Sequence, residues 1–319
     1  MKKLIATVGP SLLHTIPLKE VHNENIIYRI NGAHGTIENI ESYIREIKNQ
    51  IPNAKILMDL PGNKVRTANF EYGFIEIEEG KKFDIYFNQF NYQDFFKHLK
   101  VGNIVLANDS IFRFEIKHID YEMAKVTFLS YSTGKLQNNK GFHIRGVSSN
   151  LPFLFEKDKG LIELANKYNL EYVGLSFVRN EKDIKEAKKF IQSSEIIAKV
   201  ETLSAVENVD KILDEVEYIL IDRGDLSTDV GLLEVPKYQK YIIEKALFSN
   251  RRVFLATQFL KSMEHNPIPT FPEVIDLYNT LKTGIYGVQL SEETAVGKYP
   301  KECVNVVFDT LKKIKKEIK

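Results

Sequence analysis

Charged and polar side chains follow several short apolar segments of this sequence. Lys199 and Glu201 stand at the end of one such segment, and Arg223-Gly224-Asp225 follows the next one. Carboxylate oxygens are the ligands that hard divalent cations such as Mg²⁺ prefer, and lysine and arginine suit phosphate. We expect Gly224 and Asp225 to begin a loop whose N–H groups could hold a carboxylate or a phosphate. These groups indicate phosphoryl-transfer or enolate chemistry, in which positioning and electrostatic stabilisation dominate.

The sequence lacks the motifs of several other kinds of binding site and catalytic site. The sequence has no P-loop, no Gly-x-Gly-x-x-Gly fingerprint, no Gly-x-Ser-x-Gly elbow and no His/Cys cluster suited to zinc. A single charged residue at a strand end is most simply explained as half of an ordinary ion pair. Polar residues follow all eight apolar segments, however, and packing does not require that.

The apolar segments and the stretches between them predict the fold. Nearly continuous runs rich in β-branched residues are typical of buried parallel strands, and they occur at 4–8, 26–30, 56–58, 172–177, 196–200, 218–221, 253–256 and 286–290. Most are separated by segments with helical spacing, such as 36–50, 156–168, 205–216 and 300–318. The alternation favours an α/β fold, either a (β/α)₈ TIM barrel or a doubly wound sheet. In a barrel, the polar residues would meet at the carboxyl ends of the strands.

One connection is far longer than the others. Between residues 67 and 145 the pattern changes to period two, with turn signals between the alternating segments. Alternation of this kind is typical of antiparallel strands with one solvated face. We therefore expect a small antiparallel β domain at 67–145, inserted after strand three, between barrel parts at 1–66 and 146–319.

Composition narrows the class of protein. The chain has 319 residues, with 44 Lys and Arg against 43 Asp and Glu, which gives a net charge of +1. This balance argues against partners such as nucleic acid or a membrane surface. Cys303 is the one cysteine, so no intrachain disulfide can form. No apolar stretch is long enough for a signal peptide or a membrane helix, and we expect a cytoplasmic protein.

Motifs along nearly the whole chain resemble those of the pyruvate kinase family. They are, in order, 5–11 (IATVGPS), 29–35 (RINGAHG), 59–67 (DLPGNKVRT), 140–141 (KG), 151–158 (LPFLFEKD), 176–179 (SFVR), 199–201 (KVE), 223–226 (RGDL), 256–258 (ATQ) and 291–295 (SEETA). The resemblance implies the barrel with its inserted lid. It also implies the glycolytic reaction that transfers the phosphoryl group of phosphoenolpyruvate to ADP, with Mg²⁺ or Mn²⁺ as the cofactor.

The resemblance assigns roles to residues at the matching positions. It makes Glu201 and Asp225 the divalent-metal ligands and Lys199 the cation that stabilises the transferring phosphoryl group. The substrate would be held by Gly224, Asp225, Thr257, Arg29 and Ser291, of which Thr257 and Arg29 would also act in catalysis. The nucleotide, ADP or ATP, would contact Asn31, His34, Arg66, Lys140 and the lid residue Asp109.

Departures from the family pattern change one expectation. The monovalent-cation site of the family combines an Asn and an Asp, here Asn31 and Asp59, with a Ser and a Thr, which are here Ala33 and Leu60. Lys64 replaces the Glu of the potassium-dependent branch. This combination resembles the potassium-independent branch, in which a lysine ammonium takes the place of the cation. A fixed ammonium would supply the same positive charge as a bound ion. The alternative is that Lys64 is a solvated loop lysine.

Further departures leave the phosphoryl acceptor open. They are Gly32-Ala33, Leu60-Pro61, Asp222 and Glu292. A Mg²⁺–enolate lyase or aldolase would use the same metal pair. A redirected paralogue would use another acceptor, or would only bind phosphorylated ligands. The residues end at the last predicted barrel helix, whereas family members continue into a C-terminal domain. We therefore expect no allosteric control of the family's kind, and a monomer or a barrel-mediated homodimer.

Overall fold

The computed structural model describes residues 2–108, 111–144 and 151–317. These residues form two compact units, one of Met1–Gly62 with Glu156–Lys319 and one of Asn63–Phe155. The lid predicted at 67–145 falls inside the second unit. No helix in the described ranges is both long and apolar enough to span a lipid bilayer.

The first unit is a closed barrel, and it decides between the two predicted folds in favour of the (β/α)₈ barrel. Neighbouring strands are parallel and follow the order β1-β15-β14-β13-β12-β11-β3-β2. Their bounds are β1 Lys3–Thr7, β2 Ile26–Asn31, β3 Lys55–Asp59, β11 Tyr172–Leu175, β12 Glu195–Val200, β13 Tyr218–Asp222, β14 Arg252–Ala256 and β15 Gly287–Leu290. Apart from a residue at one end of some strands, each strand is buried, as expected for strands covered on both faces.

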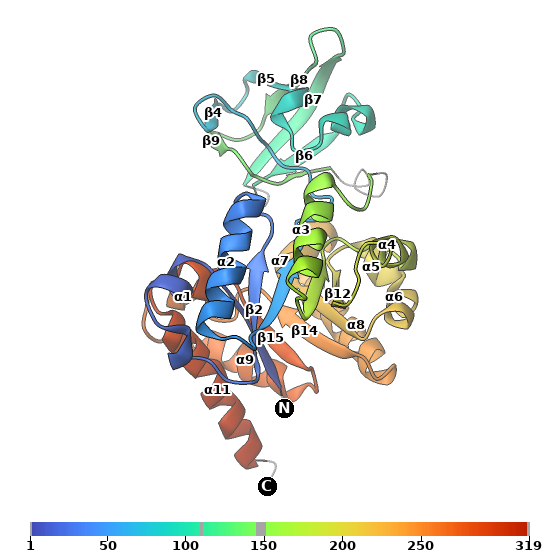
Figure 1. Ribbon diagram of the computed structural model, residues 1–319. Coiled ribbons are helices and arrows are strands. Elements are labelled where there is room, and N and C mark those ends of the chain that lie inside the picture. The colour runs from blue at the N-terminus through green and yellow to red at the C-terminus, as the bar shows by residue number, and fades with distance from the viewer. Residues whose placement is uncertain (1, 109–110, 145–150, 318–319) are drawn as a thin grey trace. The chain divides into compact units, whose positions relative to one another are not determined.

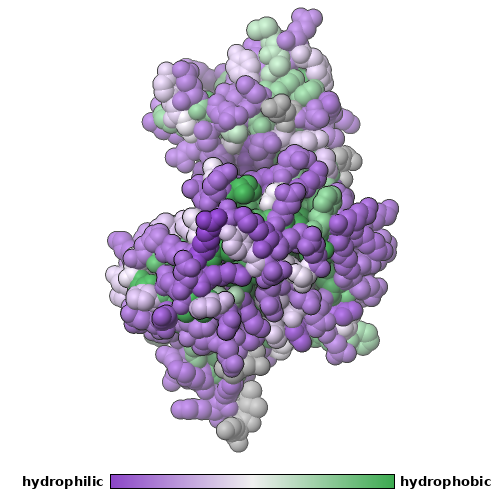
Figure 2. Space-filling view, in the orientation of Figure 1, coloured by the Kyte–Doolittle hydropathy of each residue, from purple (hydrophilic) through white to green (hydrophobic). Residues whose placement is uncertain are grey.

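Helices surround the strands of this unit (Figure 1). Their bounds are α1 Pro10–His14, α2 Ile37–Gln50, α3 Glu156–Lys167, α4 Glu181–Ala187, α5 Leu203–Glu207, α6 Val209–Glu215, α7 Arg223–Val230, α8 Val235–Phe248, α9 Phe271–Lys282, α10 Glu292–Ala295 and α11 Pro300–Glu317. In α2, the Thr36 hydroxyl caps the first turn, and Ile40, Ile44 and Ile47 form the buried face. Hydrophilic residues cover most of the face of the barrel unit seen in Figure 2.

Two segments differ from the sequence predictions. The helix expected at 205–216 is divided at Asn208, which joins α5 to α6. The prediction that Gly224 and Asp225 begin a loop is wrong, because both residues lie in the first turn of helix α7. The physical reason is Asp222, whose side chain accepts hydrogen bonds from the Gly224 and Asp225 N–H groups and so caps the helix.

The second unit is built from antiparallel strands. A five-stranded sheet has the order β10-β6-β7-β8-β5, and β4 pairs with β9. The bounds are β4 Phe74–Ile77, β5 Lys82–Tyr86, β6 Ile104–Ala107, β7 Phe112–Asp120, β8 Lys125–Ser130, β9 Gly134–Gln137 and β10 Phe142–His143. Phe112, Phe114 and Ile116 alternate with more exposed residues along β7 and pack into an aromatic-rich core with Phe90 and Phe95. Period two therefore gives this unit one buried sheet face.

Candidate active site at the carboxyl ends of the barrel strands

The strand period places a charged layer inside the barrel, directly above its apolar interior. Ile5, Ile27, Leu57, Ile197 and Leu220 belong to the interior core. Side chains two residues apart on a strand point to the same face. The next inward positions, toward the carboxyl ends of these strands, are therefore Thr7, Arg29, Asp59, Lys199 and Asp222. The barrel thus changes from aliphatic to polar within one step of two residues.

Arg29, Asp59 and Lys199 form a buried ionic network in this layer. Arg29 Nε donates to Asp59 Oδ2 over 2.7 Å, and its Nη1 donates to Thr7 Oγ1 over 2.9 Å. Lys199 Nζ lies 3.4 Å from the Asp59 carboxylate and donates to Ser176 Oγ over 2.9 Å. The two cations compensate Asp59 inside the barrel, and buried charges require such pairing.

Lys199 also contacts Glu201, two residues further along the chain. Lys199 Nζ lies 2.8 Å from Glu201 Oε1, and the Phe177 N–H donates to Glu201 Oε2 over 2.8 Å. Burial alone lowers the pKa of Lys199, but Asp59, Glu201 and Asp222 raise it above its ordinary value. Lys199 therefore remains a fixed positive charge at neutral pH.

Three carboxylates of this unit gather beside Lys199. One oxygen from each of Glu201, Asp222 and Asp225 lies within 4.8 Å of the others. Burial raises the pKa values of Glu201 and Asp222, and the nearby Asp225 charge raises both further. A cation at this position would relieve the repulsion among the three groups.

This donor set fits a hard divalent cation. It consists of carboxylate oxygens alone, which Mg²⁺ and Mn²⁺ prefer. Around an octahedral Mg²⁺ with bonds of about 2.1 Å, ligand oxygens lie roughly 3.0 to 4.2 Å apart. The three side chains would need only small movements to reach this spacing. Glu201 and Asp225 were predicted as metal ligands from the sequence, whereas the approach of Asp222 to both was not.

Thr257 approaches the same group from the end of β14. Its Oγ1 donates to Asp222 Oδ1 over 2.5 Å. The φ angle of Thr257 is 82°, a left-handed conformation that costs a β-branched residue free energy and concentrates at functional sites. Thr257 therefore combines a strained backbone with a hydroxyl that points toward the start of α7.

The remaining predicted residues of the barrel unit lie at its strand ends and turns. Asn31 ends β2, and its Oδ1 accepts from the Ala33 N–H over 3.1 Å. His34 is exposed in the turn that follows. Ser291 precedes α10, and its N–H donates to the buried carboxylate of Glu293 over 2.7 Å.

Four predicted residues belong to the second unit. Arg66 pairs with Gly141 in an isolated bridge, and its Nη1 donates to the Asn139 carbonyl over 3.2 Å. The Lys140 N–H donates to Thr67 Oγ1, and the Lys64 side chain lies against Gly141. Lys64, Arg66 and Lys140 are therefore brought together on paired segments of this unit. Asp109 lies outside the described residues.

Sequence reasoning did not assign Ser176 and Asp222 to the site. Ser176 Oγ accepts from Lys199 and donates to the Leu60 carbonyl over 2.6 Å, so it helps to fix the ammonium. Its position at the end of a strand was the available signal. For Asp222 the signal was stronger, since aspartate directly before Arg-Gly-Asp suits a helix N-cap.

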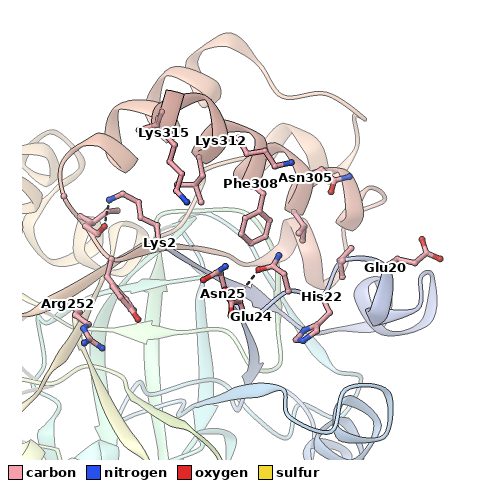
Figure 3. Close-up of a pocket in the computed structure, with 18 of the residues that line it drawn as sticks. Lys2, Glu20, His22, Glu24, Asn25, Arg252, Asn305, Phe308, Lys312 and Lys315 are labelled. Atoms are coloured by element: carbon pink, nitrogen blue, oxygen red, sulfur yellow. Dashed lines mark hydrogen bonds between the residues drawn. The ribbon is translucent and has the colours of Figure 1, made fainter. Parts of the chain in front are cut away.

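Cavities of the barrel unit lie both beside the charged layer and far from it. One, of about 440 Å³, borders α7 and is lined in part by Arg223, Gly224 and Thr257. The other, of about 870 Å³, lies at the opposite ends of the strands, where Figure 3 shows Lys2, Phe308 and Lys312 around it. Its lining has no group of three carboxylates, so the metal-type chemistry belongs to the charged layer.

The fold and this layer define a (β/α)₈-barrel protein with buried cations and carboxylates at the carboxyl ends of its strands. Comparison with known proteins identifies the family. Residues 1–304 match the model of the pyruvate kinase barrel domain. The pyruvate kinases of Geobacillus stearothermophilus and Sporosarcina psychrophila are 32% and 31% identical to the chain, and each alignment covers 96% of it. The chain belongs to the pyruvate kinase family.

The alignments cover nearly all of this chain but only about half of each relative. The chain spans 55% of the length of both of these relatives, and the same share of the pyruvate kinase of Staphylococcus aureus strain MRSA252, which is 29% identical. The barrel and its inserted unit are therefore the parts of the family that can be compared.

Proposed function

We propose that the chain catalyses transfer of the phosphoryl group of phosphoenolpyruvate to ADP, with Mg²⁺ or Mn²⁺ and without a requirement for K⁺. The observation that carries the proposal is the buried Lys199 ammonium, 2.8 Å from Glu201, beside the carboxylates of Asp222 and Asp225. A fixed cation next to an all-oxygen metal site suits a reaction in which negative charge moves between oxygens. Family membership supports the same reaction.

The residues take the following roles in this proposal. Glu201 and Asp225 hold the divalent cation, which when bound draws negative charge from the substrate oxygens. Lys199 stabilises the phosphoryl group as its bond to the enol oxygen breaks and its bond to the ADP phosphate oxygen forms. The Gly224 and Asp225 N–H groups and Thr257 hold the substrate carboxylate, and Arg29 contacts the phosphate. The enolate then takes a proton at carbon from water held by Thr257 or Ser291, which gives pyruvate.

The proposal also covers the nucleotide and the monovalent cation. We assign ADP to Asn31, His34, Arg66, Lys140 and Asp109, on the family resemblance. Lys64 would supply the positive charge of the monovalent cation.

A coupled assay for pyruvate tests the reaction. Purified chain is mixed with phosphoenolpyruvate, with ADP or Mg²⁺ omitted in turn and with a panel of other phosphoryl acceptors in place of ADP. We expect pyruvate only when both Mg²⁺ and ADP are present. Pyruvate released from other 2-oxoacids without nucleotide would replace the proposal with a lyase. Transfer to another acceptor but not to ADP would replace it with a redirected paralogue.

A further inference from the structure

Two N–H groups at the start of α7 and the hydroxyl of Thr257, which follows β14, converge on one oxygen of Asp222. Asp222 Oδ1 accepts from the Gly224 N–H over 3.0 Å, the Asp225 N–H over 3.4 Å and Thr257 Oγ1 over 2.5 Å. The N-terminal N–H groups of a helix carry partial positive charge and bind anions. We call these three donors the α7 cradle. In this structure the cradle is filled by a carboxylate of the chain itself.

The cradle has little spare room. A Cβ at Gly224 would lie 3.1 Å from Thr257 Cγ2 and 3.3 Å from Asp222 Oδ1. The glycine thus permits a close approach of the Thr257 side chain and the Asp222 carboxylate to the helix start. A second carboxylate could use these donors only by taking the place of the first.

The same donors are those assigned above to the carboxylate of the substrate, so this inference rests on the proposed function for the identity of its ligand. We propose that Asp222 is an intramolecular competitor for the α7 cradle, and that a substrate carboxylate binds there only after the Asp222 side chain leaves it. Asp222 is tethered beside the donors and is therefore present at a high effective concentration. Its negative charge also repels an incoming anion. Asp222 thus sets how tightly the site takes a carboxylate ligand.

Two variants separate occupation of the cradle from the effect of charge. Asp222→Ala leaves the three donors open. Asp222→Asn removes the charge but retains a side-chain oxygen that can accept from them, since asparagine caps helices as well as aspartate does. Pyruvate binding to the whole chain is measured by titration calorimetry at saturating Mg²⁺. We expect pyruvate to bind at least tenfold more tightly to Asp222→Ala than to the unchanged chain, and Asp222→Asn to gain less than threefold.

Loss of the helix cap is controlled with a third variant. Replacing a capping side chain by alanine destabilises a helix more than replacing it by glycine does. Asp222→Gly opens the same donors and should match Asp222→Ala in pyruvate affinity, and thermal unfolding verifies that each variant is folded.

The inference is overturned if folded Asp222→Ala and Asp222→Gly bind pyruvate no more tightly than the unchanged chain. It is also overturned if Asp222→Asn gains as much as Asp222→Ala, because charge and not occupation would then explain the effect. The coupled assay for pyruvate tests the proposed function independently of these binding measurements. A chain that makes no pyruvate but shows the predicted order of affinities contradicts the proposed function alone. A chain that makes pyruvate without that order contradicts only the role of Asp222.

Discussion

Lys199 Nζ lies 2.8 Å from Glu201 Oε1 in the interior of the barrel, and both side chains are almost completely buried. Lys199 is the penultimate residue of β12, which ends at Val200, and Glu201 directly follows the strand. A buried ammonium and a buried carboxylate compensate one another, and neither is stable in an apolar interior alone. The pair thus provides a fixed positive charge and a metal-type oxygen within one short segment.

Replacement of Lys199 by methionine tests the fixed charge. We expect Lys199→Met to lower kcat for pyruvate formation by about 10³-fold, equivalent to roughly 4 kcal/mol of barrier, because it removes a preorganised cation. Lys188→Met is the control, since this lysine is exposed and pairs with Glu215 outside the site. Steady-state kinetics, below the unfolding temperature of each variant, give the comparison. Near-normal turnover of folded Lys199→Met would contradict the role assigned to Lys199.

Metal binding by the three clustered carboxylates can be tested without measuring catalysis. Glu201→Gln removes one negative oxygen donor, and we expect it to weaken Mn²⁺ binding by at least tenfold, as followed by the electron paramagnetic resonance signal of free Mn²⁺. Glu195→Gln is the matched control, because Glu195 is exposed at the other end of the same strand. Equal Mn²⁺ affinity in the two variants would show that Glu201 does not hold the metal.

Independence from potassium depends on Lys64. We expect pyruvate formation to proceed at similar rates in KCl and NaCl of equal ionic strength. Lys64→Glu removes the fixed positive charge, so it should lower the rate in NaCl and make K⁺ stimulate the reaction several-fold. Lys82→Glu makes the same change of charge at an exposed lysine on β5. Many-fold stimulation of the unchanged chain by K⁺ would show that Lys64 does not replace the ion.

The single thiol reports on the packing of the barrel. Cys303 on α11 is fully buried, and burial, with the charges of Glu293 and Glu302, raises its pKa to about 12. Because the thiolate is the reactive form, we expect almost no reaction with Ellman's reagent at pH 8 in the native protein. One equivalent should react in guanidinium chloride. Rapid reaction of the native chain at pH 8 would show that the packing around α11 opens readily.

Patterns within short segments were sufficient for the elements of the barrel. The apolar run of β12 and the alternation along β7 follow from the burial of both strand faces in one case and of one face in the other. The sequence also placed Lys199 and Glu201 together at the end of one apolar segment. Family motifs extended these assignments to residues whose neighbours local patterns do not reveal.

Contacts between distant parts of the chain needed the tertiary structure. Arg29, Asp59 and Lys199 come from three different strands, and only closure of the barrel places Asp59 between the two cations. The sequence by itself determined which residues carry charge and where strands and most helices form, since both are local properties. Only the tertiary structure decided that Thr257, which follows the neighbouring strand, donates to Asp222 at the start of α7. That contact depends on the register of β13 against β14, which no local pattern specifies.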